Sequence, residues 1–143
     1  MTQLRNPYQQ QIDEASNLQS TLQQTTSDHE LAIEAYRMAQ REAKLTADAY
    51  AAAEAELCLD LSFTDEYKAQ KNAEGRKMVQ DVALIKARQP GGPLADAWRA
   101  KYLADSDLFN AQLAYEQSEA KFKAVCTAAM LQGSILKAAA IGW

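Results

Sequence analysis

The chain has 143 residues, a net charge of −4, 48% hydrophobic residues, and only 5 glycines and 3 prolines. This composition predicts one helical protein and argues against strong nonspecific binding of nucleic acid by the whole surface. No apolar run approaches the ~18 residues that a membrane span needs, so we expect no membrane partner. Cys58 and Cys126 lie in apolar helical stretches without a secretory signal ahead of them. This predicts buried, reduced thiols in the cytoplasm, with a disulfide between paired helices as the minor alternative.

A glutamine-rich segment opens the chain, and we separate residues 1–27 from a helical coiled-coil domain at residues 28–143. Apolar residues at spacings of three and four predict a thinly apolar helix in the first segment. The polar run Thr25–Ser27 is expected to interrupt that helix. Ser27 and Glu30 then predict a capping box at the start of the next one.

Residues 28–61 contain neither glycine nor proline and are predicted to form one long helix. Two apolar tracks follow it, which makes the apolar face broad enough to pack against two other helices. The first track is Tyr36, Ala39, Ala43, Thr46, Tyr50, Ala53 and Leu57, and the second is Leu31, Ala35, Met38, Leu45, Ala49, Ala52 and Leu59.

A shorter basic helix is predicted over residues 65–88, with Thr64 as its N-cap. The run Pro90–Gly91–Gly92–Pro93 ends it, because two prolines and two glycines cannot continue a helix. The last helix is predicted over residues 93–140. For its end, Ile141–Gly142–Trp143, we leave open a frayed tail or a segment that packs into a neighbouring subunit.

These elements predict an all-α fold: a long antiparallel helical hairpin or coiled coil with a shorter linking helix and an N-terminal helix. The last helix carries more apolar stripe than one partner helix can cover, so we expect a homo-oligomer, a dimer or larger. The residues predicted to form the helix seam and oligomer contacts are Tyr36, Tyr50, Leu57, Leu108, Tyr115, Phe122, Val125 and Leu136.

No constellation of residues predicts catalysis, and we expect no catalytic residue, metal site or cofactor. The single histidine, His29, lies near the expected helix start and is predicted to be solvated. Glu54 and Glu56 are two residues apart and point to different sides of a helix, so they are not an acid/base pair. Glu119 and Lys123 are predicted to form an ion pair one helical turn apart.

Two basic regions are candidates for binding. Arg37, Arg41 and Lys44 form a stripe, for which a salt-bridged outer face is the favoured interpretation. The second region is basic and interleaved with aromatic residues, as suits phosphate contact and base stacking in single-stranded DNA. The alternative is that its aromatic residues, Trp98 and Tyr102, are core anchors while its charges are solvated. The candidate residues of this region are Lys68, Lys71, Arg76, Lys77, Trp98, Arg99 and Tyr102.

Three stretches carry a resemblance: AEAELCLDL, FTDEYKAQKNAEGRKMVQ and LAYEQSEAKFKAVCTAAMLQGSILK. Over roughly residues 30–137 the chain resembles a group of small, uncharacterised helical bacteriophage proteins found near phage recombination and single-strand-binding genes. The resemblance implies a protein of the host-cell cytoplasm that assists DNA recombination or replication without chemistry of its own.

The leading hypothesis is therefore a non-enzymatic, self-associating helical adaptor with a protein partner and a weak contact to single-stranded DNA. A second hypothesis is a protein-directed inhibitor of a host defence complex. A third is a virion or scaffolding component.

Overall fold

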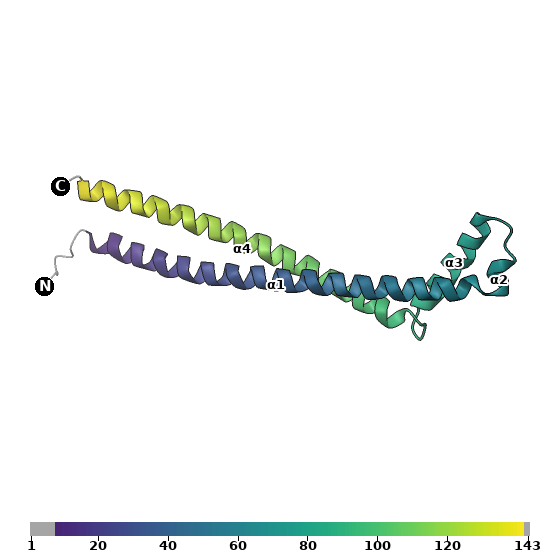
Figure 1. The fold of residues 1–143 in the computed structure, drawn as a ribbon. Helices are drawn as coiled ribbons and strands as arrows, with labels where there is room; N and C mark the ends of the chain where they lie inside the picture. The colour runs from purple at the N-terminus through teal and green to yellow at the C-terminus, as the bar shows by residue number, and fades with distance from the viewer. Residues whose placement is uncertain (1–7, 142–143) are drawn as a thin grey trace. The chain divides into compact units, whose positions relative to one another are not determined.

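A computed structural model describes residues 8–141 of the chain, and all the regular structure in that range is helical. The all-α prediction is therefore confirmed. The helices in chain order are α1 (Gln9–Ser62), α2 (Asp65–Lys68), α3 (Ala73–Arg88) and α4 (Ala95–Ile141) (Figure 1).

The chain divides into two compact units, and each is described by itself. The terminal unit combines Met1–Tyr36 with Ala111–Trp143, and the central unit is Arg37–Asn110. The boundaries fall inside α1 and α4, so each of these helices contributes one part to each unit.

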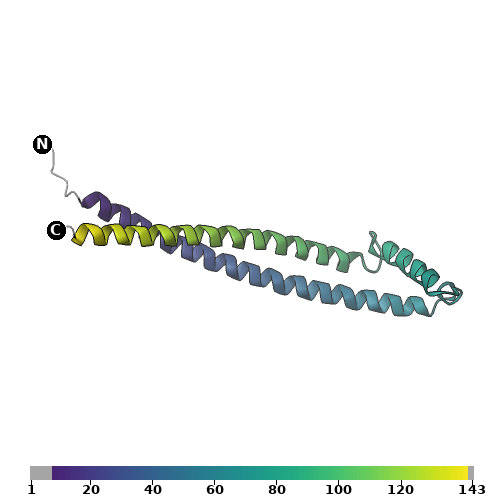
Figure 2. The same ribbon diagram turned by 90° about the horizontal axis from the view of Figure 1, so that it is seen from above.

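In the terminal unit, α1 and α4 pack as an antiparallel pair. Tyr36 of α1 stacks on Tyr115 of α4, with the ring centroids 5.4 Å apart. His29, two turns earlier on α1, stacks on Phe122, two turns later on α4, at 5.2 Å. The two helices are seen from two directions in Figures 1 and 2. The prediction that a long helix packs against the last helix is confirmed.

The core of the central unit forms where the end of α3 and the start of α4 meet α1. Leu94 is its most buried side chain, with 1% of its surface exposed. Leu94 forms a cluster with Tyr50 of α1 and Ala87 of α3. The half-buried residues packed against this cluster are Ala53, Leu57, Leu84 and Ala97.

The turn between α3 and α4 depends on its two glycines. Gly91 has φ 85°, a left-handed conformation that only glycine adopts without strain. The Gly92 N–H donates to the Gln89 carbonyl at 2.8 Å, and the Leu94 N–H donates to the Ala87 carbonyl at 2.9 Å. A Cβ atom on Gly92 would overlap that Ala87 carbonyl. The turn therefore delivers Leu94 to the core only because Gly92 has no side chain.

Gly92→Ala is accordingly expected to lower the free energy of unfolding by about 1–3 kcal/mol, because backbone must shift to make room. Urea unfolding followed by circular dichroism measures the change. Gly133→Ala is the control, since a Cβ atom there meets nothing within 4 Å. That helical position should be stabilised by about 0.5–1 kcal/mol. Equal stability of Gly92→Ala and the parent would contradict this description of the turn.

The predicted helix break at Thr25–Ser27 is wrong, because α1 runs through it without interruption. The Thr25 hydroxyl donates to the Thr21 carbonyl at 2.6 Å, and the Thr26 hydroxyl donates to the Leu22 carbonyl at 2.7 Å. The threonines thus bond back to the preceding turn and stay helical. Ser27 lies inside the helix and forms no capping box, and the predicted boundary at residue 27 falls within α1.

The predicted basic helix over residues 65–88 is two helices. Thr64 caps α2 as predicted, but α2 ends after about one turn. Asn72 then starts α3, where its side-chain oxygen accepts from the Gly75 N–H at 2.7 Å. A second strong N-cap within the segment is the local reason for the break.

Candidate functional site

An aromatic–cation cluster joins α1, α3 and α4 in the central unit. The Arg88 Nε–H donates to the Tyr50 hydroxyl at 2.6 Å. The Arg88 guanidinium also lies 4.4 Å from the centroid of the Trp98 ring and 3.9 Å from a carboxylate oxygen of Glu54. Trp98 in turn packs against Tyr50, with centroids 5.3 Å apart. These contacts make Trp98 an anchor of the packing, which is the alternative that the sequence left open.

Tyr102 behaves differently from Trp98. It lies one turn further along α4, and 68% of its surface is exposed. Lys101, between them, forms an ion pair with Asp105 at 3.5 Å. Tyr102 is therefore no core anchor and remains available for contacts outside the central unit.

Burial raises the pKa of the Tyr50 phenol above 10, and the hydrogen bond from Arg88 opposes this shift only in part. A raised folded-state pKa favours the neutral phenol, so its contribution to stability is fully present below the unfolded-state pKa of about 10. It is lost as the pH rises through the folded-state pKa, because the unfolded chain then binds fewer protons than the folded one.

The free energy of unfolding should thus decrease above about pH 10, and the part of this decrease that is due to Tyr50 should be absent in the Tyr50→Phe variant. Urea unfolding of the parent and of Tyr50→Phe between about pH 8 and pH 11 measures this decrease. Subtracting the two free energies of unfolding removes the contribution of the other titrating groups. A difference that does not change with pH would contradict the burial of an ionisable Tyr50.

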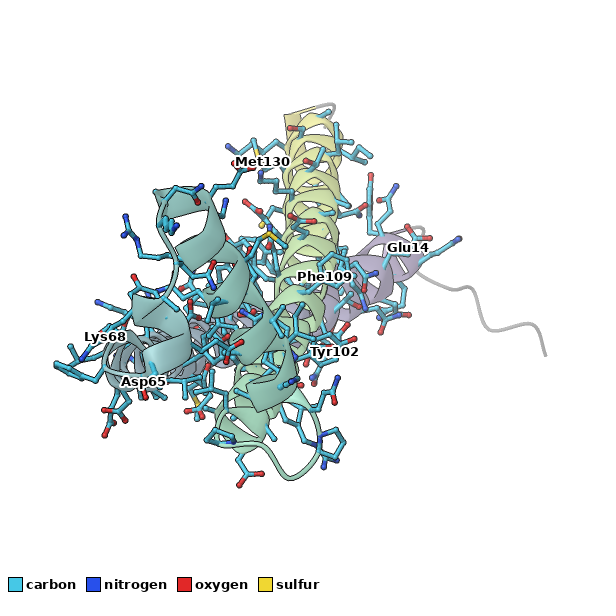
Figure 3. The ribbon with its side chains drawn as sticks, turned by 90° about the vertical axis from the view of Figure 1, so that its right-hand side faces the viewer. Glu14, Asp65, Lys68, Tyr102, Phe109 and Met130 are labelled. Atoms are coloured by element: carbon cyan, nitrogen blue, oxygen red, sulfur yellow. The ribbon has the colours of Figure 1, made fainter. Side chains whose placement is uncertain are left out.

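The seven candidate nucleic-acid-binding residues do not come together. Arg76 precedes Arg88 by twelve positions on α3, which is about 18 Å along the helix axis. Trp98 packs on Arg88 at the far end of that helix. Figure 3 shows Lys68 and Tyr102 on different sides of the central unit. The structure thus separates an exposed basic corner at α2 and the start of α3 from the aromatic residues of α4. The basic corner consists of Lys68, Lys71, Arg76 and Lys77.

A hollow of about 310 Å³ lies beside the turn between α3 and α4. Arg99 and the exposed part of Trp98 line it, as a nucleotide site would require, but Asp96 lines it as well. The acidic Asp96 beside Arg88 and Arg99 weakens the attraction of this hollow for a polyanion. Its complete lining is Arg88, Pro90, Gly91, Ala95, Asp96, Trp98 and Arg99.

A second hollow, of about 350 Å³, follows the apolar edge of α3. Met78 and Val82 are two of its apolar members, and both are exposed. This edge therefore leaves apolar surface in water. The full lining is Leu61, Glu66, Gln70, Gly75, Met78, Val79, Val82, Ala83 and Lys86.

The prediction of a solvated His29 is wrong, because the ring is half-buried between Tyr115 and Phe122. Its Nδ1 lies 2.8 Å from the Ser118 hydroxyl oxygen. The Ser118 hydroxyl also donates to the Tyr115 carbonyl at 2.9 Å, so Ser118 connects the His29 ring to the backbone of α4. The sequence contained a signal for this packing. His29 precedes Tyr36 by two helical turns, so the two side chains lie on the same face of a helix that continues through Thr25–Ser27.

The predicted seam residues lie on the inner faces of their units to different depths. Tyr50 is buried, with 6% of its surface exposed. The half-buried members are Tyr36, Leu57, Leu108, Tyr115, Phe122, Val125 and Leu136. The half-buried state of most of them shows that pairing of α1 with α4 leaves part of the stripe uncovered.

The predicted salt-bridged outer face of α1 does not form within the described part of the chain. Arg37, Arg41 and Lys44 are exposed, and none of them makes an ion pair with a described residue. The predicted pair of Glu119 and Lys123 does form, at 3.2 Å, and is confirmed.

The most distinctive feature of the surface is its apolar content. Among the described residues, five hydrophobic side chains are buried, whereas seventeen large ones are exposed. Exposed apolar side chains occur on α1, α3 and α4; those shown in Figure 3 include Tyr102, Phe109 and Met130. The candidate functional site is therefore this exposed apolar surface.

Within residues 8–141, no group of three or more His, Cys, Asp or Glu side chains is placed to hold a metal ion. The described helices include none that is long and apolar enough to cross a membrane. Cys58 and Cys126 are free thiols, and both are half-buried rather than buried. The two alternatives for the end of the chain were a frayed tail and a segment that packs into a neighbouring subunit. They concern Gly142 and Trp143, which lie outside the described residues.

No protein-family model matches the chain, and neither the curated proteins nor the solved structures include one similar to it.

Proposed function

We propose that this protein is a non-enzymatic helical adaptor that self-associates through the apolar faces its own fold leaves exposed. The observation that carries the proposal is the excess of exposed over buried large hydrophobic side chains. Each 100 Å² of apolar surface removed from water contributes about 2.5 kcal/mol, so covering these faces is strongly favourable.

The exposed residues also occur on faces that point away from the helix pairs. On α1, Leu31 lies in the terminal unit, and Met38, Leu45 and Leu59 lie in the central unit, all exposed. Monomeric proteins rarely leave such faces open, and their usual occupant is another helix. This surface supports an adaptor function, since a helix with two apolar faces can hold two partners at once.

The resemblance to small helical bacteriophage proteins supports a cellular role. It favours a host-cell cytoplasmic adaptor that is an accessory factor in phage DNA recombination or replication. The main alternatives are an inhibitor directed at a host protein complex and a virion scaffold. Both would use the same apolar faces without touching DNA.

Self-association has a thermodynamic signature that is simple to measure. The temperature of thermal unfolding, followed by circular dichroism, should rise with protein concentration, because folding and association are linked. An unfolding temperature independent of concentration over about two decades would contradict the proposal.

A contact with single-stranded DNA is a second proposal, based on the exposed basic corner of α2 and α3. Its four cations form no ion pair with any described residue. Because the aromatic residues lie elsewhere, the contact would be to phosphates alone, without base stacking. Such binding would be weak, insensitive to sequence and steeply weakened by salt.

Fluorescence anisotropy with single-stranded and duplex oligonucleotides, at low and moderate salt, tests the contact. The double variant Arg76→Glu, Lys77→Glu should abolish binding. The control Arg37→Glu, Lys44→Glu makes the same change of charge on α1 and should retain at least half of the affinity. Equal loss in both double variants would show a general charge effect and no site at the basic corner.

A further inference from the structure

The outer face of α1 in the central unit carries a regular apolar ridge. Met38, Leu45, Ala52 and Leu59 recur every seven residues, and we call these four residues the outer ridge. The three large members have 60%, 64% and 59% of their surface exposed. A seven-residue repeat keeps side chains in one line along a helix and is the pattern of a helix–helix seam. The inner face, with Tyr50, points to α3 and α4 instead.

One edge of the outer ridge carries opposite charges at the same spacing. Arg41 follows Met38 by three residues, and Asp48 follows Leu45 by three, so both flank the ridge on the same side. Both side chains are exposed, and neither forms an ion pair with any residue that the structure describes.

These charges are complementary to a second copy of themselves in one orientation. If two copies of α1 pair antiparallel about a two-fold axis near Lys44 and Leu45, Arg41 lies opposite the partner subunit's Asp48, and the reverse pair forms by symmetry. In a parallel, in-register pair, the same edges of the two helices lie on opposite sides of the seam, so Arg41 would not meet the partner subunit's Asp48.

The same axis matches large side chains with small ones. Met38 then lies opposite the stretch of the second helix that contains Ala49 and Ala52, whose short side chains leave room for it. Glu42 and Glu56 also lie along the ridge, and polar residues at a few seam positions fix register at some cost in stability.

We propose that the outer ridge is the self-association surface and that its occupant is the outer ridge of a second copy, paired antiparallel. This inference rests on the proposed self-association and adds to it the surface, the orientation and the register.

The first test measures the mass of the full-length Leu45→Glu variant by analytical ultracentrifugation. Each copy would then bring one glutamate to the centre of the seam. These two charges should weaken association more than about 100-fold and leave a species of 15.8 kDa. Gln40→Glu is the matched control, because Gln40 is exposed on the same helix and away from the ridge. It should associate like the parent. Helix content by circular dichroism should be unchanged in both, since Leu45 makes few contacts within the chain.

The second test addresses orientation by exchanging the charges. Arg41→Asp alone and Asp48→Arg alone should each weaken association about tenfold, because each turns two attractive pairs into repulsive ones. The double exchange should restore the affinity of the parent to within about twofold, since the pairs form again with reversed sign.

The possible results distinguish failure of the outer ridge as the surface from failure of self-association itself. A Leu45→Glu variant that associates like the parent would overturn the outer ridge as the surface while leaving self-association in place. A double exchange weaker than both single variants would overturn the antiparallel register. A parent protein that is monomeric at every concentration would overturn both proposals, and the ridge would then belong to a different protein partner.

Discussion

Tyr50→Ala is expected to lower the free energy of unfolding by about 3–5 kcal/mol, as for other buried aromatic residues. The ring is buried at the meeting point of α1, α3 and α4, and it packs against Trp98. Its loss would also leave the Arg88 guanidinium without the hydroxyl to which it donates. Urea unfolding followed by circular dichroism measures the change.

Tyr102→Ala is the matched control, since it removes the same side chain from an exposed position in the central unit. It should change the free energy of unfolding by less than about 1 kcal/mol. If both variants unfolded at the same urea concentration, Tyr50 would not be the centre of the core.

Leu94→Ala is expected to cost about 2–5 kcal/mol, the usual range for a fully buried leucine. Leu94 follows directly after the Gly-Gly-Pro turn, and its N–H donates to the Ala87 carbonyl. Truncating the side chain would leave a cavity that this short, hydrogen-bonded turn cannot close. The free energy of unfolding from urea titrations measures the effect.

Leu103→Ala provides the comparison, because Leu103 lies on the same helix with about half of its surface exposed. A loss below about 1 kcal/mol is expected for it. An equal loss for the two leucines would contradict the placement of Leu94 in the core and of Leu103 at the surface.

The sequence was informative about helix type and about the inner faces. Tyr36 and Tyr50 share one predicted stripe on α1, and Tyr115 and Phe122 share another on α4, because a helix repeats its faces about every seven residues. In the structure Tyr36 stacks on Tyr115, and Tyr50 packs against Trp98. The ends of the short helices were predictable where a local signal existed, as at Thr64 and in the Pro-Gly-Gly-Pro turn.

The errors arose where two local signals compete. Thr25 and Thr26 suit a helix cap, but they equally well bond back to the preceding turn, and only their packed surroundings decide between these states. The Asn72 cap was not predicted, because an asparagine can also lie inside a helix with its side chain in solvent.

The contacts that could not be predicted join residues that lie far apart along the chain. The hydrogen bond between Arg88 and Tyr50 spans 38 positions, and the His29–Ser118 bond spans 89. The basic-aromatic candidate site failed to assemble for the opposite reason. Its residues are near one another in sequence, but α3 is a rigid rod that holds its two ends apart.

Self-association is tested most directly by the mass of the purified full-length protein in solution, measured by sedimentation equilibrium over a wide range of concentrations. We predict a reversible assembly whose mass is a multiple of 15.8 kDa and falls toward 15.8 kDa on dilution. A mass of 15.8 kDa at every concentration would contradict self-association through the exposed apolar faces.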